Sequence, residues 1–598
     1  MRRVWFFAGV LALTVLCASS VQAAISVTYN IKTDVNRTPI SPYIYGSNWG
    51  SGTDYTIRRS GGNRLTAYNW ENNYSNAGND WYYFNDNYLV GGLPSGQQKI
   101  PGIAITTFHD QALSQGQASV VTLQMAGYVS ADGNHEVNLI TETAPSIRFK
   151  KCVFAKGAPF CSPPGNPDGN DPNVYIDEFV NFLVNKYGHA GEPNGVKFYD
   201  LDNEPDIWSG THKEVHPVKA TCVEYKNLSV ATSLAVKNVD PNARIMGPVS
   251  YGFNGFYSFQ DATDWASVKN GYGWFLDYYL DKMEANSVVA GKRLLDALDV
   301  HWYPEARDGN ITALDGNRIV DVPSVYSRAN CNARMQAPRS LWDYNYHEVS
   351  WIEKWQGAWL PILPPLKTSI NTYYPDTNLA ITEYAYGGET HYSGGIATTD
   401  VLGIFGKYGV YIATYWGEGN YVDAAIKMYR NYDGAHHKFG DTNVPATRSS
   451  DVNNSIYASI FGSDTNELHL IVLNKNFDSA ITGTFNITSS KNYICGRVWA
   501  FDANSPNITK RTGISTISSN SFTYSVPPVT VCHIVLATKY QQSDLNTDCS
   551  VDLADLDIFS NQWLHAGDCS ADPNCADLDG DEFVDFFDFA LLGEEWQL

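Results

Sequence analysis

The stretch Gly195-Val-Lys-Phe-Tyr-Asp-Leu-Asp-Asn-Glu-Pro205 joins an apolar, aromatic-rich run to an abrupt polar end. The run predicts a short buried strand, and Pro205 prevents its continuation in a hydrogen-bonded ladder. Glu204 is therefore expected at the mouth of a strand, where its carboxylate can face a substrate. The stretch Asn378-Leu-Ala-Ile-Thr-Glu383 repeats this arrangement. Two such carboxylates suit the hydrolysis of a glycosidic bond, in which one protonates the leaving oxygen and the other attacks or stabilises the sugar cation.

Strand-like runs recur on both sides of these two stretches, and most are separated by helix-like segments. The runs are Tyr43–Trp49, Leu65–Trp70, Val120–Tyr128, Val196–Asp202, Arg244–Val249, Leu298–Tyr303, Leu379–Glu383 and Tyr411–Trp416. The helix-like segments include Val174–Tyr187, Thr221–Val239, Gly273–Asn286, Leu366–Tyr373 and Asp400–Tyr408. This alternation predicts an α/β protein with a (β/α)8 barrel over residues 41–430. The alternative is an open doubly wound sheet, but the sequence has no Gly-rich phosphate loop to support it.

The predicted strand ends carry polar and aromatic residues. They are Trp49, Trp70, Asn203 with Glu204, His301 with Trp302 and Tyr303, Glu383, and Trp416. In (β/α)8 barrels the functional groups lie at the C-terminal ends of the strands. We therefore expect these side chains to meet at one face of the barrel.

The chain outside the barrel divides into smaller parts. Residues 431–540 contain short alternating runs punctuated by Asn, Ser, Thr and Gly, which predict an all-β sandwich. Residues 24–40 include a strand-like run, Ile25–Ile31, that is expected to join this sandwich. Residues 541–543 are a predicted linker, and residues 544–598 form a separate acidic module.

The N-terminus predicts export. Two arginines are followed by an apolar run and small residues, so residues 1–23 have the pattern of a secretory signal peptide. The apolar run is too short for a membrane span, and no later segment resembles one. The formal net charge of −22 argues against binding to nucleic acid, whose phosphates require Lys and Arg. We therefore expect a secreted protein, extracellular or associated with the cell surface.

The acidic module contains a near-repeat with a period of 33 residues. Its two copies carry oxygen ligands at positions 1, 3, 5, 9 and 12 of a calcium loop. These residues are Asp544, Asn546, Asp548, Asp552 and Asp555 in the first copy, and Asp577, Asp579, Asp581, Asp585 and Asp588 in the second. The pattern predicts two bound calcium ions and a small helical fold. The sixth positions are Cys549 and Glu582, which predicts strain in the turn because Gly is usual there.

Nine cysteines remain if the signal peptide is removed. Cys152 and Cys161 are close enough in sequence to close a loop, and Cys495 and Cys532 flank strand-like runs that allow pairing across a sheet. Three further cysteines, Cys549, Cys569 and Cys575, lie in the acidic module. An exported chain permits disulfides, but the spacing does not fix the pairing.

Several long motifs occur in the order of a known family. They are Asp202-Asn-Glu-Pro-Asp-Ile-Trp208, Tyr251-Gly-Phe-Asn254, Asp299-Val-His-Trp-Tyr-Pro-Glu305, Gln336-Ala-Pro-Arg-Ser-Leu-Trp342, Ile381-Thr-Glu-Tyr384 and Gly403-Ile-Phe-Gly-Lys-Tyr-Gly409. Over residues 25 to 540 the chain resembles glycoside hydrolase family 44. The resemblance implies a (β/α)8 barrel with a β-sandwich, and a retaining endo-β-1,4-glucanase that often acts on xyloglucan.

The same resemblance implies roles for individual residues. Glu204 corresponds to the general acid/base and Glu383 to the nucleophile, and Asn203 is expected to hydrogen-bond the sugar 2-hydroxyl. Further implied contacts with substrate or nucleophile are those of Arg64, His301, Tyr303 and Trp416. Arg64 has a structural ion pair as its alternative role, and Trp416 has core packing.

The resemblance also implies calcium at the barrel rim and a docking partner. Glu71, Asp168, Asn170 and Asp171 supply suitable oxygen ligands for one structural calcium. The acidic module resembles a dockerin, which implies a cohesin-type protein as partner. Two other functions stay open: an inactive barrel that only binds glycan, and an exo-acting glycosidase of another barrel family.

Overall fold

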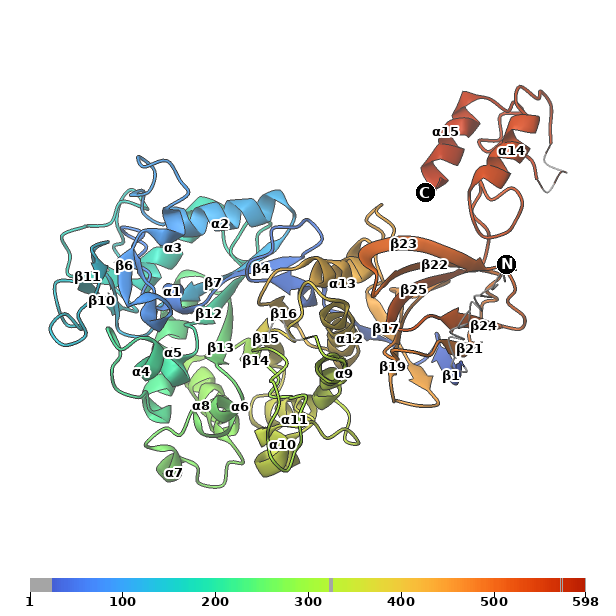
Figure 1. Ribbon diagram of the computed structural model, residues 1–598. Helices are drawn as coiled ribbons and strands as arrows, with labels where there is room; N and C mark the ends of the chain where they lie inside the picture. The colour runs from blue at the N-terminus through green and yellow to red at the C-terminus, as the bar shows by residue number, and fades with distance from the viewer. Residues whose placement is uncertain (1–23, 322–325, 570–571, 573, 597–598) are drawn as a thin grey trace, which may run out of the picture.

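The computed structural model describes residues 24–321, 326–569, 572 and 574–596 (Figure 1). The predicted signal peptide at residues 1–23 lies outside them. A closed barrel occupies one end of the molecule, a pair of β-sheets packs beside it, and the C-terminal segment stands apart at the far end of the sheets (Figure 1). Among the described helices, none combines the length and the apolar character needed to cross a membrane.

The barrel has eight strands, and every neighbouring pair in it is parallel. In spatial order the strands are β12 (Phe198–Leu201), β13 (Arg244–Ser250), β14 (Ala297–Trp302), β15 (Asn378–Tyr384), β16 (Ile412–Tyr415), β3 (Gly46–Ser47), β4 (Ile57–Ser60) and β7 (Ala118–Leu123). The longer helices are α2 (Ile103–Ser114), α3 (Ile176–Tyr187), α5 (Cys222–Val239), α8 (Phe275–Ala290), α11 (Leu363–Tyr373), α12 (Tyr392–Tyr408) and α13 (Asn420–Arg430). The prediction of a parallel eight-stranded barrel is confirmed.

The loops above the barrel carry shorter elements. Short helices are α1 (Asn63–Thr66), α4 (Trp208–Thr211), α6 (Phe253–Ser258), α7 (Trp265–Val268), α9 (Arg328–Gln336) and α10 (Trp351–Gln356). Two small sheets consist of β5 (Ser75–Asn76), β6 (Phe84–Asp86) and β9 (His135–Glu136), and of β8 (Tyr128–Ser130), β10 (Phe149–Val153) and β11 (Asn173–Tyr175).

One predicted barrel strand was wrong. Leu65–Trp70 is not a strand, because residues 63–66 form α1 and Trp70 is buried against the rings of Phe179 and Phe182. The second strand is instead β4, whose sequence is Ile-Arg-Arg-Ser. Two adjacent arginines do not look like a buried strand. They fit here because the two side chains face opposite sides of it.

The barrel interior is apolar at its base and polar above. The basal layer consists of Ile57, Val120, Phe198, Met246, Ala297, Ala380 and Ile412. Two residues further along each strand, side chains of the same orientation form a second layer that includes Arg59, Thr122, Asp200, Asp299, Thr382 and Thr414, all buried. This second layer supports the strand ends from below.

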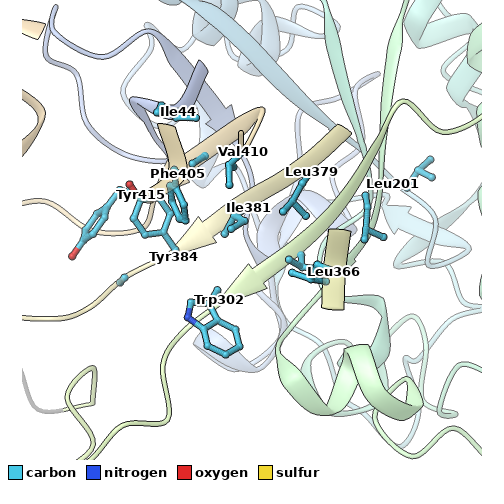
Figure 2. Packing of buried hydrophobic residues seen from close by; sticks show 14 of the residues in the cluster. Ile44, Leu201, Trp302, Leu366, Leu379, Ile381, Tyr384, Phe405, Val410 and Tyr415 are labelled. Atoms are coloured by element: carbon cyan, nitrogen blue, oxygen red, sulfur yellow. The ribbon is translucent and has the colours of Figure 1, made fainter. Parts of the chain in front are cut away.

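The outward positions of the strands pack against the helices. Leu379 and Ile381 of β15 belong to the large apolar cluster that also contains Leu366 of α11 and Phe405 of α12 (Figure 2). Leu379 and Ile381 face the helices, whereas Ala380 and Thr382 face the barrel interior. This alternation fixes the register of β15, since a shift by one residue would place apolar groups in the polar interior layer.

The two sheets beside the barrel form a sandwich. One sheet is β18 (Ala446–Arg448), β1 (Ile25–Lys32), β21 (Ile481–Thr488) and β24 (Ser521–Val526). The other is β2 (Thr38–Pro39), β17 (Thr442–Val444), β19 (Asn454–Phe461), β20 (Asp464–Asn474), β25 (Thr530–Ala537), β22 (Cys495–Asp502) and β23 (Ser505–Ile514). Tyr29 and Phe485 of the first sheet share one core with Leu470 and Ile534 of the second.

The sandwich is attached to the barrel through α12. Asp400 of this helix forms a buried ion pair with Lys475 at 2.6 Å and accepts a hydrogen bond from the Tyr457 hydroxyl at 2.6 Å. Gly403 lies so close to the Tyr457 ring that an added Cβ would fall 2.2 Å from it. The absence of a side chain at residue 403 therefore permits this contact.

Candidate active site

The structure brings the two predicted glutamates together at the C-terminal mouth of the barrel. Glu204 follows β12, and Glu383 lies near the end of β15. One side-chain oxygen of each glutamate and one ring nitrogen of His301, on β14, lie within 4.8 Å of one another. His301 Nδ1 is 2.9 Å from Glu204 Oε1 and 3.5 Å from Glu383 Oε2. The two carboxyl groups and the imidazole therefore converge at one point of the barrel mouth.

The backbone around Glu204 is strained. Asp202, Glu204 and Val249 all have positive φ values of 68°, 47° and 58°. For the β-branched Val249 this conformation is a rare outlier. The strand end is held by Asp202, whose carboxylate accepts hydrogen bonds from the Thr66 hydroxyl at 2.6 Å and from the Asn203 backbone at 2.7 Å. Strain of this kind persists only where surrounding contacts enforce it, as occurs at functional sites.

The carboxylate of Glu383 is held from two sides. Arg59 Nη1 donates to Glu383 Oε1 at 2.7 Å, and the Tyr303 hydroxyl donates to Oε2 at 2.7 Å. Arg59 is fully buried and also forms an ion pair with Asp200. Both donors lower the free energy of the ionised carboxylate. Glu383 is therefore held in one orientation by two contacts that favour its ionised form.

The arginine at Glu383 was not predicted. Arg64, which was predicted as a possible contact, forms its alternative structural ion pair with Asp86, donating at 2.5 and 3.0 Å. Its guanidinium also lies 4.2 Å from the Tyr88 ring centre. The sequence does not predict Arg59 as a site residue, because it does not predict β4 as a strand. The segment Ser60-Gly61-Gly62 after it is the signal for a strand end followed by a tight loop, and an added Cβ at Gly61 would lie 2.0 Å from the guanidinium.

Burial affects the two glutamates unequally. The pKa of Glu204 is raised well above its ordinary value, first by burial and then by the negative charge of Glu383. Burial also raises the pKa of Glu383, but Arg59 and the Tyr303 hydrogen bond oppose the increase. The pKa of His301 is lowered well below its ordinary value by burial and by Arg59, so the imidazole is neutral. The first proton taken up by this pair therefore resides on Glu204.

Asn203 is fixed through its carbonyl oxygen. Oδ1 accepts hydrogen bonds from Arg59 Nη2 at 3.0 Å and from the Gly62 backbone at 3.2 Å. Two donors on the oxygen assign the amide orientation. The amide nitrogen is thereby directed away from Arg59 as a donor.

Aromatic side chains flank a cavity beside these residues. Trp416, after β16, lies over the Gly61–Gly62 loop, and an added Cβ at Gly62 would lie 2.8 Å from its ring. Trp49 meets Trp416 edge to face, with ring centres 5.4 Å apart, and is 47% exposed. Both rings line a cavity of about 470 Å³ that also contacts Arg59 and Trp81. Trp416 thus lies at an open surface, whereas Trp70 does not.

The residues predicted to bind calcium at the barrel rim make other contacts. Glu71 forms an ion pair with Lys150 at 2.8 Å, and Lys150 also donates to the Gly169 carbonyl. Asp168 accepts from the backbone of Asn170, and Asp171 accepts from the Tyr175 hydroxyl. Over the described ranges, this set is not among the clusters of three or more acidic, His or Cys ligand atoms within 4.8 Å of one another. A calcium ion there stays a prediction.

The second acidic loop of the tail does form such a cluster. Asp577, Asp579 and Asp581 place one carboxylate oxygen each within 4.8 Å of the others. In the first loop the carboxylate of Asp544 accepts from the backbone of Asp548 and Cys549. Each loop leads into a helix, α14 (Leu553–Asn561) or α15 (Phe586–Glu595), through a capping box that ends in Asp555 or Asp588.

Two buried carboxyl groups that converge at one barrel mouth, one of which binds a proton more tightly than the other, are the arrangement typical of glycoside hydrolases. Known proteins lead to the same class. Residues 74–306 match the profile of glycoside hydrolase family 44. Endoglucanase A of Paenibacillus lautus is 52% identical over 546 residues, which are 90% of this chain and 76% of that protein.

Several solved structures are similar to this chain in fold as well as in sequence. A family 44 xyloglucanase of Paenibacillus polymyxa, solved with xyloglucan, is 53% identical with a TM-score of 0.83. Cel44A, a family 44 endoglucanase of Clostridium thermocellum, is 55% identical with a TM-score of 0.82. Each match covers 86% of this chain and 100% of the other. The chain belongs to glycoside hydrolase family 44.

Proposed function

We propose that the protein is a secreted, retaining endo-β-1,4-glucanase that cleaves xyloglucan and related plant β-glucans. The observation that carries this proposal is the arrangement of Glu204, His301 and Glu383. One carboxylate oxygen of each glutamate and one ring nitrogen of the histidine lie within 4.8 Å of one another. Retaining glycosidases need their two carboxyl groups about 5 Å apart, because one of them attacks the sugar directly. Inverting enzymes need a wider gap that admits a water molecule.

Glu383 is the proposed nucleophile. Arg59 and Tyr303 hold both of its oxygens, so its attack on the anomeric carbon needs no reorientation. The glycosidic bond breaks as the bond from Glu383 to carbon forms. Glu204, which keeps its proton because of burial and the charge of Glu383, protonates the leaving oxygen. Glu204 then acts as a base for the water that hydrolyses the glycosyl-enzyme.

The neighbouring residues have supporting roles in this proposal. The amide nitrogen of Asn203 donates to the sugar 2-hydroxyl, a contact that strengthens in the transition state. Neutral His301 keeps Glu204 in place without adding a charge that would favour its ionised form. Trp416 and Trp49 present indole faces or edges to sugar rings along the cavity beside Arg59.

The first experiment compares two soluble polymers. With xyloglucan and carboxymethylcellulose we expect a rapid fall in viscosity while few reducing ends are released, because an endo-acting enzyme cuts within the chain. Slow loss of viscosity with steady release of monosaccharide would favour the exo-acting alternative. A chain that binds both polymers and releases no reducing ends would be an inactive binding barrel.

The pH profile tests the assignment of Glu204. Asp206 is buried, its pKa is raised to about 7 by burial, and its charge raises the pKa of Glu204. Above pH 7 Asp206 is ionised, so Asp206→Asn removes a charge that favours protonated Glu204. We expect the alkaline limb of kcat/KM to move to lower pH by about 1 unit, measured on an aryl cellotrioside.

Asp376→Asn is the matched control, because Asp376 is exposed at the opposite end of the barrel and precedes β15. Its alkaline limb should coincide with that of the unmodified enzyme. An unchanged limb in Asp206→Asn would contradict the assignment of the alkaline limb to Glu204.

The tail is a further part of the proposal: we infer that it binds two calcium ions and docks onto a cohesin-type protein. Carboxylates that converge without a cation repel one another, and the pKa of Asp544 is raised to about 6 by burial and by Asp555 and Asp548. These donor sets suit calcium. Exposed apolar side chains on the two helices supply a contact face, namely Leu553, Phe586, Phe587 and Phe589.

Calcium removal is expected to unfold the tail and spare the barrel. Chelation should abolish the helical signal of α14 and α15 in full-length protein, because the carboxylates of the tail lose their counter-ions. Hydrolysis of xyloglucan should continue, because neither Glu204 nor Glu383 is among the predicted calcium ligands. Amide hydrogen exchange of residues 544–596 with and without calcium checks this. Equal protection in both conditions would contradict calcium binding.

A further inference from the structure

Two buried thiols meet where the tail touches the sandwich. Cys495, the first residue of β22, is 3% exposed, and Cys549, in the first acidic loop, is 1% exposed. They share one small apolar cluster with Ala537, and each thiol shifts the pKa of the other, raising that of Cys495 and lowering that of Cys549. Cys549 Sγ also lies 3.6 Å from the Ile514 carbonyl oxygen.

Few other contacts attach the tail. Neither α14 nor α15 packs along a strand of the sandwich in the described residues (Figure 1). A cavity of about 1410 Å³ separates the two parts, and its lining includes Cys495, Trp499 and Arg497 on one side and Leu556 and Trp596 on the other. The cluster of Cys495, Ala537 and Cys549 is therefore a point at which the tail packs directly on the sandwich.

The backbone of Cys549 adopts an unfavourable conformation. Cys549 has a φ of 76°, a left-handed conformation that favours glycine. The corresponding residue of the second repeat, Glu582, has a φ of 71° but is exposed. Only the first loop thus turns this strained residue inward, onto another thiol.

We propose that Cys495 and Cys549 form a disulfide that fixes the tail to the β-sandwich. The inference rests on the proposed export of the chain, since an oxidising compartment is required. The Cys549 thiolate attacks the disulfide of an oxidant, either an oxidoreductase in its disulfide form or oxidised glutathione, and releases one thiol. The Cys495 thiolate then attacks the Cys549 sulfur and displaces the second thiol. Two protons leave the cysteines, and two electrons reduce the oxidant.

The bond forms while the tail is still folding, because both sulfurs are buried in the final structure. Cys532 is excluded as the partner of Cys495. On the paired strands β22 and β25, Cys495 lies opposite Ala537 and Cys532 lies opposite Ala500. Five residues of offset correspond to roughly 17 Å, whereas a disulfide needs Cα atoms within about 7 Å.

Peptide mapping of the full chain tests the proposal. The protein is produced in an oxidising compartment, or treated with oxidised glutathione until Cys569 and Cys575 are joined as in the structure. It is then alkylated with N-ethylmaleimide without reduction and digested with trypsin. Cleavage after Lys491, Arg497 and Lys539 yields peptides 492–497 and 540–598. We expect the two joined, four hydrogens lighter than their reduced sum.

The variants make the result specific. In Cys495→Ser, residue Cys549 should become alkylated once the protein is denatured, and the joined peptide should disappear. Cys532→Ser, which removes another buried thiol of the same sheet, should retain the joined peptide. Maleimide on both Cys495 and Cys549 in protein whose Cys569–Cys575 bond is complete would overturn the proposal. Because the readout is a mass, that outcome leaves the proposed hydrolysis untouched.

A second readout follows the tail itself. Brief trypsin treatment of the native chain is expected to cut after the exposed Lys539. The segment 540–598 should then stay attached on a gel without reductant and separate when reductant is added. Release without reductant would count equally against the bond.

Discussion

Replacing Glu383 with alanine is expected to lower kcat on xyloglucan by at least about 10⁴-fold, because the variant lacks the attacking carboxylate. The deletion leaves a space beside Arg59 and Tyr303 that a small anion can enter. With an aryl glycoside that has a good leaving group, added azide should restore turnover and yield the α-glycosyl azide, since azide attacks the face that Glu383 would have attacked.

The corresponding Glu204→Ala variant should differ in product. There Glu383 still forms the glycosyl-enzyme, and azide replaces the water that Glu204 would have activated, so the β-glycosyl azide is expected. Glu418→Ala, at an exposed glutamate two residues after Trp416, serves as the control and should retain full activity. The same anomer from both variants, identified by nuclear magnetic resonance, would mean that the two roles are wrongly assigned.

Replacing Arg59 with methionine should affect both stability and activity. Arg59 is the cation that faces Asp200 and Glu383 inside the barrel, and the pKa of Arg59 is raised because both carboxylates favour its charged form over the effect of burial. Removing one partner of a buried ion pair costs about 3–5 kcal/mol. We expect a loss of that size in the free energy of unfolding and a fall of at least about 10²-fold in kcat.

Arg58→Met is the matched control, because Arg58 precedes Arg59 on β4 and faces the other way, with its guanidinium 5.5 Å from the Phe108 ring centre. Two of its buried nitrogens have no hydrogen-bond partner, so its loss should cost less than about 1 kcal/mol. Urea unfolding of both variants checks the difference. Equal stability losses in the two would contradict the account of the ion pair.

A double variant separates the structural role of Arg59 from its role at the proposed nucleophile, Glu383. Asp200→Asn combined with Arg59→Met removes one of the two carboxylates that the arginine neutralises. Part of the lost stability should return, because one unpaired buried charge is eliminated. Activity should stay low, since Glu383 still lacks its cation. Recovery of both together would show that Arg59 acts only through folding.

The barrel was predictable because six of its strands, β7, β12, β13, β14, β15 and β16, carry apolar residues that are buried on both faces. In β15, Leu379 and Ile381 pack outward and Ala380 packs inward, which gives a continuous apolar run in the sequence. Strand β4, residues 57–60, lacks such an apolar run. It is short and contains two arginines, and only the fold reveals that Asp200 and Glu383, from distant segments, neutralise one of them.

The pair of glutamates could be predicted for the same topological reason. Parallel strands of a closed barrel end at one mouth, so residues that follow β12 and β15 must meet there. The support beneath them was not predictable. Asp299, whose pKa is raised well above its ordinary value by burial and by the charge of Asp200, accepts hydrogen bonds from the backbone and the hydroxyl of Thr382. Such contacts between strands depend on register, which local sequence does not contain.

The most direct test of the account is the identity of the residue that becomes glycosylated. The enzyme is incubated with a 2-deoxy-2-fluoro cellotrioside bearing a good leaving group, and the peptide covering residues 368–407 is sequenced by mass spectrometry. The account predicts one cellotriosyl group on Glu383. Attachment to Glu204 or to any other residue, or rapid turnover to the inverted sugar without a covalent adduct, would contradict it.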